Sequence, residues 1–406
     1  MSEALRIRIE GALEPFAPRA RWVLEVMAGA LGRRAAFVDG PADVVYAPDE
    51  PGEGVWIPMQ RDAQEFFAGP AAFPGPRAHA CRGLTLLFPP ARPDRAVPGD
   101  VVASAFYLLA RWDEHRVPDR DRFGRLPLAE SAFGRIGGLE LDDPPVEGYI
   151  ATLRAALGLP GPDAWRVFLT HDIDRIRRNT PRGLARGVRR RGPRALLDLA
   201  GRDPWDNMPD LLETSSRRGL APTVFLIGRN RHRLDGTPRR TYERERARLA
   251  RTVRAAGGEV ALHAAFASSE DGAALAAELA GLRAEVGHVE GVRYHYLRFR
   301  YHETVRWLED AGARYDASLG FSEAPGYACG IARPFRPWIV GEERPARLEL
   351  VPLAVMDTTL QSHLGLAADA AGDRALRVLG AARRAGGAVA LLWHNTYLAE
   401  PRAPGY

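Results

Sequence analysis

The amino-acid sequence predicts an α/β protein in which a smaller N-terminal α/β region precedes a longer series of βα units. From residue 163 onward, apolar runs typical of strands alternate with segments of helical spacing. Repeated βα units imply a parallel sheet or barrel. A Pro/Gly-rich stretch, GLPGPDAW, precedes this series, so we expect a boundary near residue 162 and domains at 1–162 and 163–406.

The N-terminal region contains both strand-like and helical segments. We expect strands at 5–10 and 35–40, and helices at 20–32, at 100–115 and from 144 to the Pro/Gly stretch. Apolar residues at helical spacing define these helices, and a glycine ends the first of them. The Ala-Phe-Tyr-Leu-Leu run of the second is expected to be core. The charged loop at 116–127 is interpreted as a salt-bridged surface turn.

Histidines mark the ends of several predicted strands in the C-terminal series. The strands are expected at 167–170, 222–228, 259–263, 291–296, 348–357 and 387–394, and the helices at 208–220, 242–258, 271–287, 302–313 and 366–386. Three strands end in or beside a histidine, namely His171, His263 and His394, and a fourth strand contains His295. Catalytic residues of (β/α) barrels lie at the carboxyl ends of strands. These histidines are therefore candidate site residues.

The composition excludes several kinds of chemistry. All 56 basic residues are arginine because the sequence contains no lysine, which excludes a Schiff-base lysine and a Walker A phosphate loop. Two cysteines and no CxxC motif argue against a disulfide framework. No window reaches the roughly 18 consecutive apolar residues of a membrane span. The N-terminus lacks the apolar region of a secretory signal, so a cytoplasmic protein is expected.

The segment 175–194 is strongly basic, with nine arginines and no acidic residue. We interpret it as a solvated Arg-rich loop. The alternative is a peripheral contact with a membrane surface or another anionic ligand. The segment contains no aromatic residue and no recognisable nucleic-acid-binding motif, so nucleic acid is not expected as a partner.

One apolar strand ends in Thr170-His171-Asp172-Ile173-Asp174. Side chains two residues apart in an extended segment share a face, so Asp172 and Asp174 are expected to point into one site. Imidazole and carboxylate groups are ordinary ligands of Zn²⁺ and related divalent ions. Two carboxylates this close also allow one to bind a metal while the other moves protons.

The order of these motifs over about residues 165–396 resembles the polysaccharide deacetylase family, the NodB-homology domain of carbohydrate esterase family 4. The resemblance makes Asp172 the catalytic base and Asp174 a metal ligand. The strand PTVFLIG resembles the family's ATFF strand, and LLWHNT resembles its final L-x-H motif, which supplies Leu392 and His394. The resemblance implies a distorted (β/α) barrel, here preceded by a smaller α/β domain, that removes N- or O-acetyl groups from sugars with a divalent metal.

Two motifs depart from the family pattern. The second motif usually supplies two metal-binding histidines, but here LHAAFASS keeps His263 and has Ala267 in place of the second. The third motif, usually R-x-P-Y, reads RYHY and keeps Arg293 and Tyr296, with His295 in place of proline. We infer that His295 supplies the missing imidazole. The alternative is that His295 is a core or substrate-binding residue and that the metal is lost or weakly held.

The resemblance implies a role for each motif residue. One divalent metal is expected, Zn²⁺ first, with Co²⁺, Ni²⁺ or Mn²⁺ as alternatives, and its expected ligands are Asp174, His263 and His295. Asp172 would take a proton from the attacking water, and Arg293 would keep it ionised. His394 would donate a proton to the leaving amine, the Tyr296 backbone N–H would stabilise the oxyanion, and Leu392 would contact the acetyl methyl group.

The expected activity is that of a carbohydrate deacetylase whose substrate is a nucleotide- or lipid-linked acetylated sugar, because a cytoplasmic location is expected. Two alternatives stay open. Ala267 favours a metal-free amide hydrolase of the same barrel type, and the basic segment favours a catalytically retired protein that binds an anionic polymer. The retained Asp172, Arg293 and His394 argue against the second alternative, since a binding protein needs no base, acid and arginine together.

Overall fold

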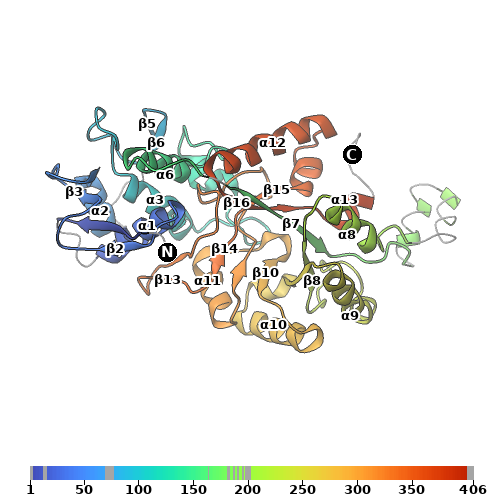
Figure 1. Ribbon diagram of the computed structural model, residues 1–406. Coiled ribbons are helices and arrows are strands. Elements are labelled where there is room, and N and C mark those ends of the chain that lie inside the picture. Colours follow the sequence, from blue (N-terminus) through green and yellow to red (C-terminus); the bar gives the residue numbers. More distant parts are fainter. Residues whose placement is uncertain are drawn as a thin grey trace.

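The computed structural model describes residues 3–11, 16–68, 77–162, 164–180 and 203–399, together with 183–185, 188–189, 192–193 and 196. Within these residues the chain is a mixed α/β structure with two larger, parallel sheets. The N-terminal sheet lies at one end of the molecule, and the larger sheet with its helices occupies the rest (Figure 1). Among the described helices, none has the length and apolar character needed to cross a membrane.

The N-terminal region contains a four-stranded parallel sheet in the order β2-β1-β3-β4. Its strands are β1 (Leu5–Ile9), β2 (Ala35–Phe37), β3 (Val44–Ala47) and β4 (Val55–Pro58), followed by a hairpin of β5 (His79–Cys81) and β6 (Leu84–Leu86). The helices are α1 (Ala17–Ala30), α2 (Arg61–Ala68), α3 (Val101–Leu109), α4 (Trp112–Arg116), α5 (Ala132–Arg135) and α6 (Pro145–Ala156), with a turn η1 (Leu128–Glu130). The predicted helix at 100–115 is interrupted at Arg111, whose left-handed backbone (φ 48°) separates α3 from α4.

The C-terminal region is built on an eight-stranded parallel sheet in the order β14-β11-β10-β9-β8-β7-β16-β15. Its strands are β7 (Arg166–Ile173), β8 (Thr223–Ile227), β9 (Glu259–Ala264), β10 (Gly291–Tyr294), β11 (Tyr315–Asp316), β14 (Glu349–Leu350), β15 (Leu353–Met356) and β16 (Ala388–Leu392). A separate antiparallel pair consists of β12 (Trp338–Ile339) and β13 (Arg344–Pro345).

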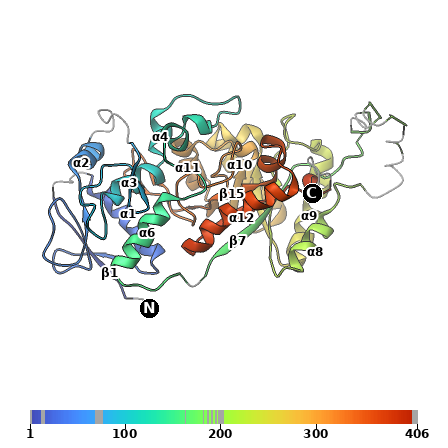
Figure 2. The same ribbon diagram turned by 90° about the horizontal axis from the view of Figure 1, so that it is seen from above.

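Helices lie around the outside of this sheet. They are α8 (Met208–Ser216), α9 (Arg239–Ala255), α10 (Gly272–Val286), α11 (Tyr301–Asp310), α12 (Ala368–Ala385) and α13 (Asn395–Ala399), with short helical turns η3 (Phe266–Ser269), η4 (His295–Leu297) and η5 (Thr359–His363). In Figure 1, α10 and α11 lie below the sheet and α12 above it. The view from above places α12 between α6 of the N-terminal region and α8 and α9 (Figure 2). The alternation of strands and helices therefore follows the sequence prediction.

One chain segment supplies both edges of the larger sheet. β14 pairs with β11 and β15 pairs with β16, so the single strand predicted at 348–357 is in fact two strands at opposite edges. The N–H of Leu353 also donates to the carbonyl of Leu319, near the end of β11, at 2.8 Å. The sheet is therefore curled into a half-barrel, and its interior holds an apolar cluster that includes Phe225, Ala317, Leu297, Met356 and Leu392.

The strand predicted at 291–296 is shorter than expected. β10 ends at Tyr294, and the chain then turns sharply through η4. In this turn Tyr296 and Leu297 both have left-handed backbones, with φ of 60° and 52°. His295 therefore lies directly after the strand rather than within it.

The two predicted domains share a continuous apolar core. Trp22 on α1 contacts Trp338 on β12, with ring centroids 5.4 Å apart, and its Nε1 donates to the carbonyl of Arg336 at 2.9 Å. Arg19 on the same helix forms a two-pronged ion pair with Glu343, with both N–O distances at 2.8 Å. The N-terminal region is thus fixed to the C-terminal region by buried contacts as well as by the chain connection.

Tyr301 offers a test of this shared core. Its buried hydroxyl donates to the carbonyl of Leu109 on α3 and accepts from the N–H of Trp338, both at 3.0 Å. Tyr301→Phe removes both bonds, so we expect the free energy of unfolding, measured by urea denaturation, to fall by about 1–3 kcal/mol. The matched control is Tyr296→Phe, because that half-buried hydroxyl makes no hydrogen bond within the described residues. Equal stabilities for the two variants would contradict the role assigned to Tyr301.

Candidate active site

The site lies at the carboxyl ends of neighbouring parallel strands. In the register of the sheet, Arg293 on β10 is paired with His263 on β9, and Leu392 on β16 with Thr170 on β7. Because the strands are parallel, the residues that follow these positions lie at the same end of the half-barrel, where the strands finish. This geometry explains how motifs spread over more than 200 residues of sequence meet at one place, as expected from the strand-end histidines.

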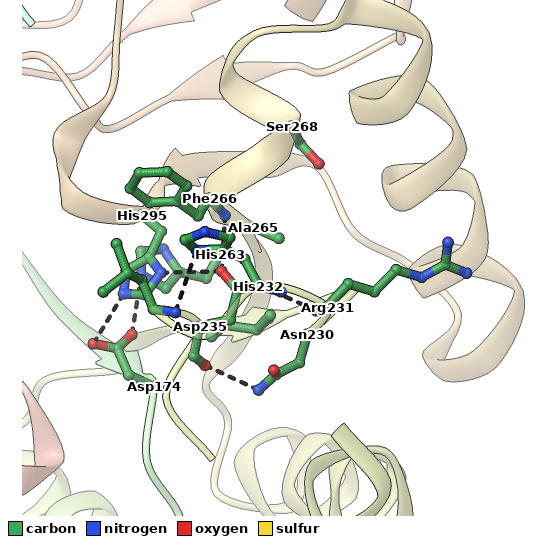
Figure 3. A network of polar contacts seen from close by, with 12 residues as sticks. Asp174, Asn230, Arg231, His232, Asp235, His263, Ala265, Phe266, Ser268 and His295 are labelled. Atoms are coloured by element: carbon green, nitrogen blue, oxygen red, sulfur yellow. Dashed lines mark hydrogen bonds and ion pairs between the residues drawn. The ribbon is translucent and has the colours of Figure 1, made fainter. Parts of the chain in front are cut away.

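Three of the predicted site residues form a compact cluster, shown in Figure 3. His263 Nε2 lies 3.1 Å from Asp174 Oδ1, and His295 Nε2 lies 3.4 Å from Asp174 Oδ2. One potential ligand atom from each residue lies within 4.8 Å of the others. Ala267 is exposed on η3, and His295 comes to the cluster from the turn directly after β10, the strand that pairs with β9. The cluster thus contains a second imidazole, contributed by another part of the chain.

Two atoms of this cluster have the environment of metal ligands. Asp174 Oδ1 and His263 Nε2 are buried and have no hydrogen-bond partner within the described residues, although they lie 3.1 Å apart. Leaving such atoms unpaired costs about 1–3 kcal/mol each. His263 Nδ1 contacts the carbonyl of Arg293 at 3.0 Å, and a proton on Nδ1 would leave a lone pair on Nε2 facing Asp174. Two imidazoles and a carboxylate fit a zinc-like ion with an open position.

Asp235 is a member of this site that the sequence did not reveal. Its Oδ1 lies 3.5 Å from His295 Nδ1 and accepts the N–H of Phe266 at 2.8 Å. Its Oδ2 accepts the N–H groups of Arg231 and His232 at 3.1 and 2.8 Å. A carboxylate behind a ligating histidine orients the ring and makes it a better ligand. A lone Asp in a loop carries no motif signal, and only its contacts identify it.

The carboxylates around His295 control its protonation. Burial alone would lower the pKa of His295, but Asp174 and Asp235 raise it to about 9. Burial would likewise raise the pKa of Asp174, but His295 and His263 hold it well below its usual value. A cation that binds here must therefore displace a proton from the His295 ring.

Asp172 and Arg293 form a buried ion pair next to the cluster. Arg293 Nη1 donates to Asp172 Oδ1 at 2.9 Å and to Thr170 Oγ1 at 2.9 Å, and Asp172 Oδ2 lies 3.6 Å from His263 Nε2. Burial favours a higher pKa for Asp172, but Arg293 and the imidazoles of His263 and His394 outweigh it and lower the pKa. Asp172 is therefore an ionised carboxylate near neutral pH and is available to accept a proton.

His394 pairs with Asp357, a second carboxylate that the sequence did not assign to the site. Asp357 Oδ1 lies 2.7 Å from His394 Nδ1, and Asp357 Oδ2 accepts the His394 backbone N–H at 2.5 Å. Burial favours a lower pKa for His394, but Asp357, together with Asp174 and Asp172, raises it to about 10. His394 is thus a cation near neutral pH and is able to donate a proton.

The remaining predicted residues lie around this group. Leu392 is buried in the apolar interior cluster, and Tyr296 is half-buried and directly follows His295. His171 is buried, its Nδ1 lies 2.7 Å from the carbonyl of Trp393, and burial lowers its pKa to about 4. His171 alternates with Asp172 along the strand and so faces the other side, which accounts for its place outside the ligand cluster. Within the basic segment at 175–194, residues 181–182, 186–187, 190–191 and 194 lie outside the described residues.

The family match found for this chain lies outside the candidate site. A family of unknown function (DUF7033) matches residues 39–159, within the N-terminal region. No curated protein and no solved structure matches the chain. The family match includes none of the candidate ligands or titrating groups, so functional inference depends on the geometry of the site.

Metal binding is the first property to test. We expect the purified protein to bind one Zn²⁺ or Co²⁺ per chain, measured by elemental analysis and by the visible spectrum of Co²⁺, and to lose it in Asp174→Ala and His295→Ala. Asp235→Asn should weaken affinity by about 10- to 100-fold, because the carboxylate orients a ligand.

The control is His288→Ala, because that exposed ring lies outside the ligand cluster, with its Nε2 3.6 Å from Glu290 Oε1. Metal retained in His295→Ala would place the third ligand elsewhere. A wild-type chain that binds neither ion, even when supplied in excess, would exclude the predicted metal centre.

Proposed function

We propose that this protein is a metal-dependent hydrolase that removes an acetyl group from the nitrogen of an N-acetylated sugar. The proposal depends on one observation. A set of side chains suited to bind a metal lies beside an ionised Asp172 and a cationic His394, at the carboxyl ends of the strands. Hydrolysis of an acetamide needs a base for the water and an acid for the leaving amine. The order of the motifs, which resembles that of polysaccharide deacetylases, also supports a distorted barrel of that type.

A divalent ion bound by Asp174, His263 and His295 would supply Lewis-acid chemistry, polarising the acetyl carbonyl and making water more acidic. Asp172 would accept the proton of the attacking water, and its pairing with Arg293 keeps it ionised for this role.

The other residues would act on the leaving group and on the carbonyl. His394, held by Asp357, would donate its Nε2 proton to the departing nitrogen. The Tyr296 N–H would stabilise negative charge on the carbonyl oxygen, and Leu392 would contact the acetyl methyl group. These roles divide base and acid between two groups whose pKa values are shifted in opposite directions, which is typical of acid–base sites.

The proposed substrates are sugars linked to a nucleotide or a lipid. A metal-free amide hydrolase and a retired polymer-binding protein are the alternatives. The cluster of Asp174, His263 and His295 favours the metal-dependent reaction over the first, and the shifted pKa values of Asp172 and His394 favour an enzyme over the second.

The base is tested with acetate release from a panel of acetylated hexosamines in free, nucleotide diphosphate-linked and lipid diphosphate-linked forms. Asp172→Asn should keep bound metal but lose activity by about 10²- to 10⁴-fold, because it removes the proton acceptor. Metal content and thermal unfolding of the variant are the controls. Full activity in Asp172→Asn would exclude Asp172 as the base, and no acetate release from any substrate by the metal-loaded wild type would refute the deacetylase.

The role of His394 as the general acid is tested by changing its partner, Asp357. Its carboxylate raises the pKa of His394 to about 10, and burial would otherwise lower that pKa. A general acid must be protonated, so activity is lost as the pH rises through its pKa. Asp357→Asn should therefore move the basic limb of the pH profile of kcat/KM to lower pH while leaving the acidic limb in place. An unmoved basic limb would show that another group donates the proton.

A further inference from the structure

A turn of the N-terminal region, residues 121–125, lies against the candidate site. The turn is closed by Asp121, whose Oδ1 accepts the N–H groups of Phe123 and Arg125 at 2.8 and 3.0 Å. Asp121 Oδ2 binds the Arg125 guanidinium at Nε and Nη2, at 2.8 and 2.7 Å. The sequence predicts a salt-bridged surface turn within 116–127, and the structure shows that this turn also faces the C-terminal region.

Two reciprocal hydrogen bonds join the turn to the chain that follows β10. Arg125 Nη1 donates to the carbonyl of Tyr296 at 2.9 Å, and Arg298 Nε donates to the carbonyl of Phe123 at 2.6 Å. The ring of Phe123 stacks on that of Tyr296, with centroids 5.0 Å apart and planes inclined by 17°. Both hydrogen bonds are charge-assisted, which makes them stronger than neutral ones.

The segment that follows β10 has an unfavourable backbone conformation that surrounding contacts must stabilise. Tyr296 (φ 60°, ψ 17°) and Leu297 (φ 52°) both have left-handed backbones without being glycine. Each such residue costs about 1–3 kcal/mol and persists only where the surroundings fix it. Leu297 is fixed by the apolar interior of the half-barrel. The Tyr296 ring contacts Phe123 of the N-terminal turn as well as His295 and Phe266, and the Tyr296 carbonyl is held by Arg125 of the turn. The backbone of Tyr296 directly follows His295, so this conformation also determines where His295 lies.

We propose that Arg125 is a positioning residue of the site, and that the N-terminal turn holds the Tyr296 backbone in its left-handed conformation for the reaction. The expected effect on kcat rests on the proposed function, whereas the expected hold on the Tyr296 backbone rests on geometry alone. It gives a defined role to the N-terminal region, which matches a family of unknown function. In that role the region completes the wall of the site beside the proposed oxyanion donor.

The test compares Arg125→Ala with Arg120→Ala in the full-length, metal-loaded protein. Arg120 is the matched control, because its guanidinium donates to the carbonyls of Val117 and Asp119 in its own loop, and its ion pair with Glu114 on α4, at 4.0 Å, also lies within the N-terminal region. In Arg125→Ala we expect faster amide hydrogen exchange in peptides covering 291–300, measured by mass spectrometry, with unchanged metal content. We also expect kcat to fall by roughly 10- to 100-fold with a much smaller change in KM, since small displacements of a site are costly.

Arg125→Lys, which keeps a cationic donor, should restore part of the loss, and Arg120→Ala should behave like the wild type. Unchanged exchange in Arg125→Ala would overturn the proposal, and so would faster exchange with unchanged kcat. A wild-type protein without deacetylase activity would count against the proposed function alone, because the exchange experiment would still decide whether the turn holds Tyr296.

Discussion

A buried guanidinium, that of Arg293, sets the geometry on which the rest of the site depends. It donates to Thr170 and Asp172 on β7 and to the carbonyl of Ala317 after β11, and its Cζ lies 4.2 Å from the ring centre of Phe225 on β8. Removing a charge from water costs several kcal/mol, so this side chain is stable only beside an ionised carboxylate. The charge that keeps Asp172 ionised is therefore also the one that connects four strands of the half-barrel.

The same residue orients a candidate metal ligand through its backbone. The carbonyl of Arg293 contacts His263 Nδ1 at 3.0 Å, which favours a tautomer whose other nitrogen faces Asp174. His295 is oriented in the same manner by a carboxylate, that of Asp235. Each imidazole of the cluster thus has one nitrogen held by the protein and the other turned toward a common point, so the arrangement is preorganised rather than dependent on a ligand to create it.

The sequence could predict the sheet and much of the site, because both depend on short-range patterns. Alternating apolar and helical segments indicated the βα series, and strand ends indicated Asp172, Asp174, His263 and His394. The place of Asp235 in the site could not be predicted, because this residue lies 60 residues from His295 and belongs to an irregular loop. The division of 348–357 into two edge strands could not be predicted either, because the pairing partners of a strand are determined by tertiary contacts and not by its own residues.

The N-terminal region matters to the site because strain in one part of a chain must be balanced in another. A left-handed Tyr296 after a buried strand is unfavourable in isolation. The half-barrel interior contacts its neighbour Leu297, and the Tyr296 ring lies against His295 and Phe266. Further balancing contacts, including the hydrogen bond to the Tyr296 carbonyl, come from Arg125 and Phe123, more than 160 residues earlier, in a region that shares its apolar core with the half-barrel. The βα series alone contributes the candidate ligands together with Asp172 and His394, but the Tyr296 backbone would then lack its contacts with Arg125 and Phe123. The two regions are therefore better regarded as one structural unit, in which both contribute to the surroundings of the candidate site.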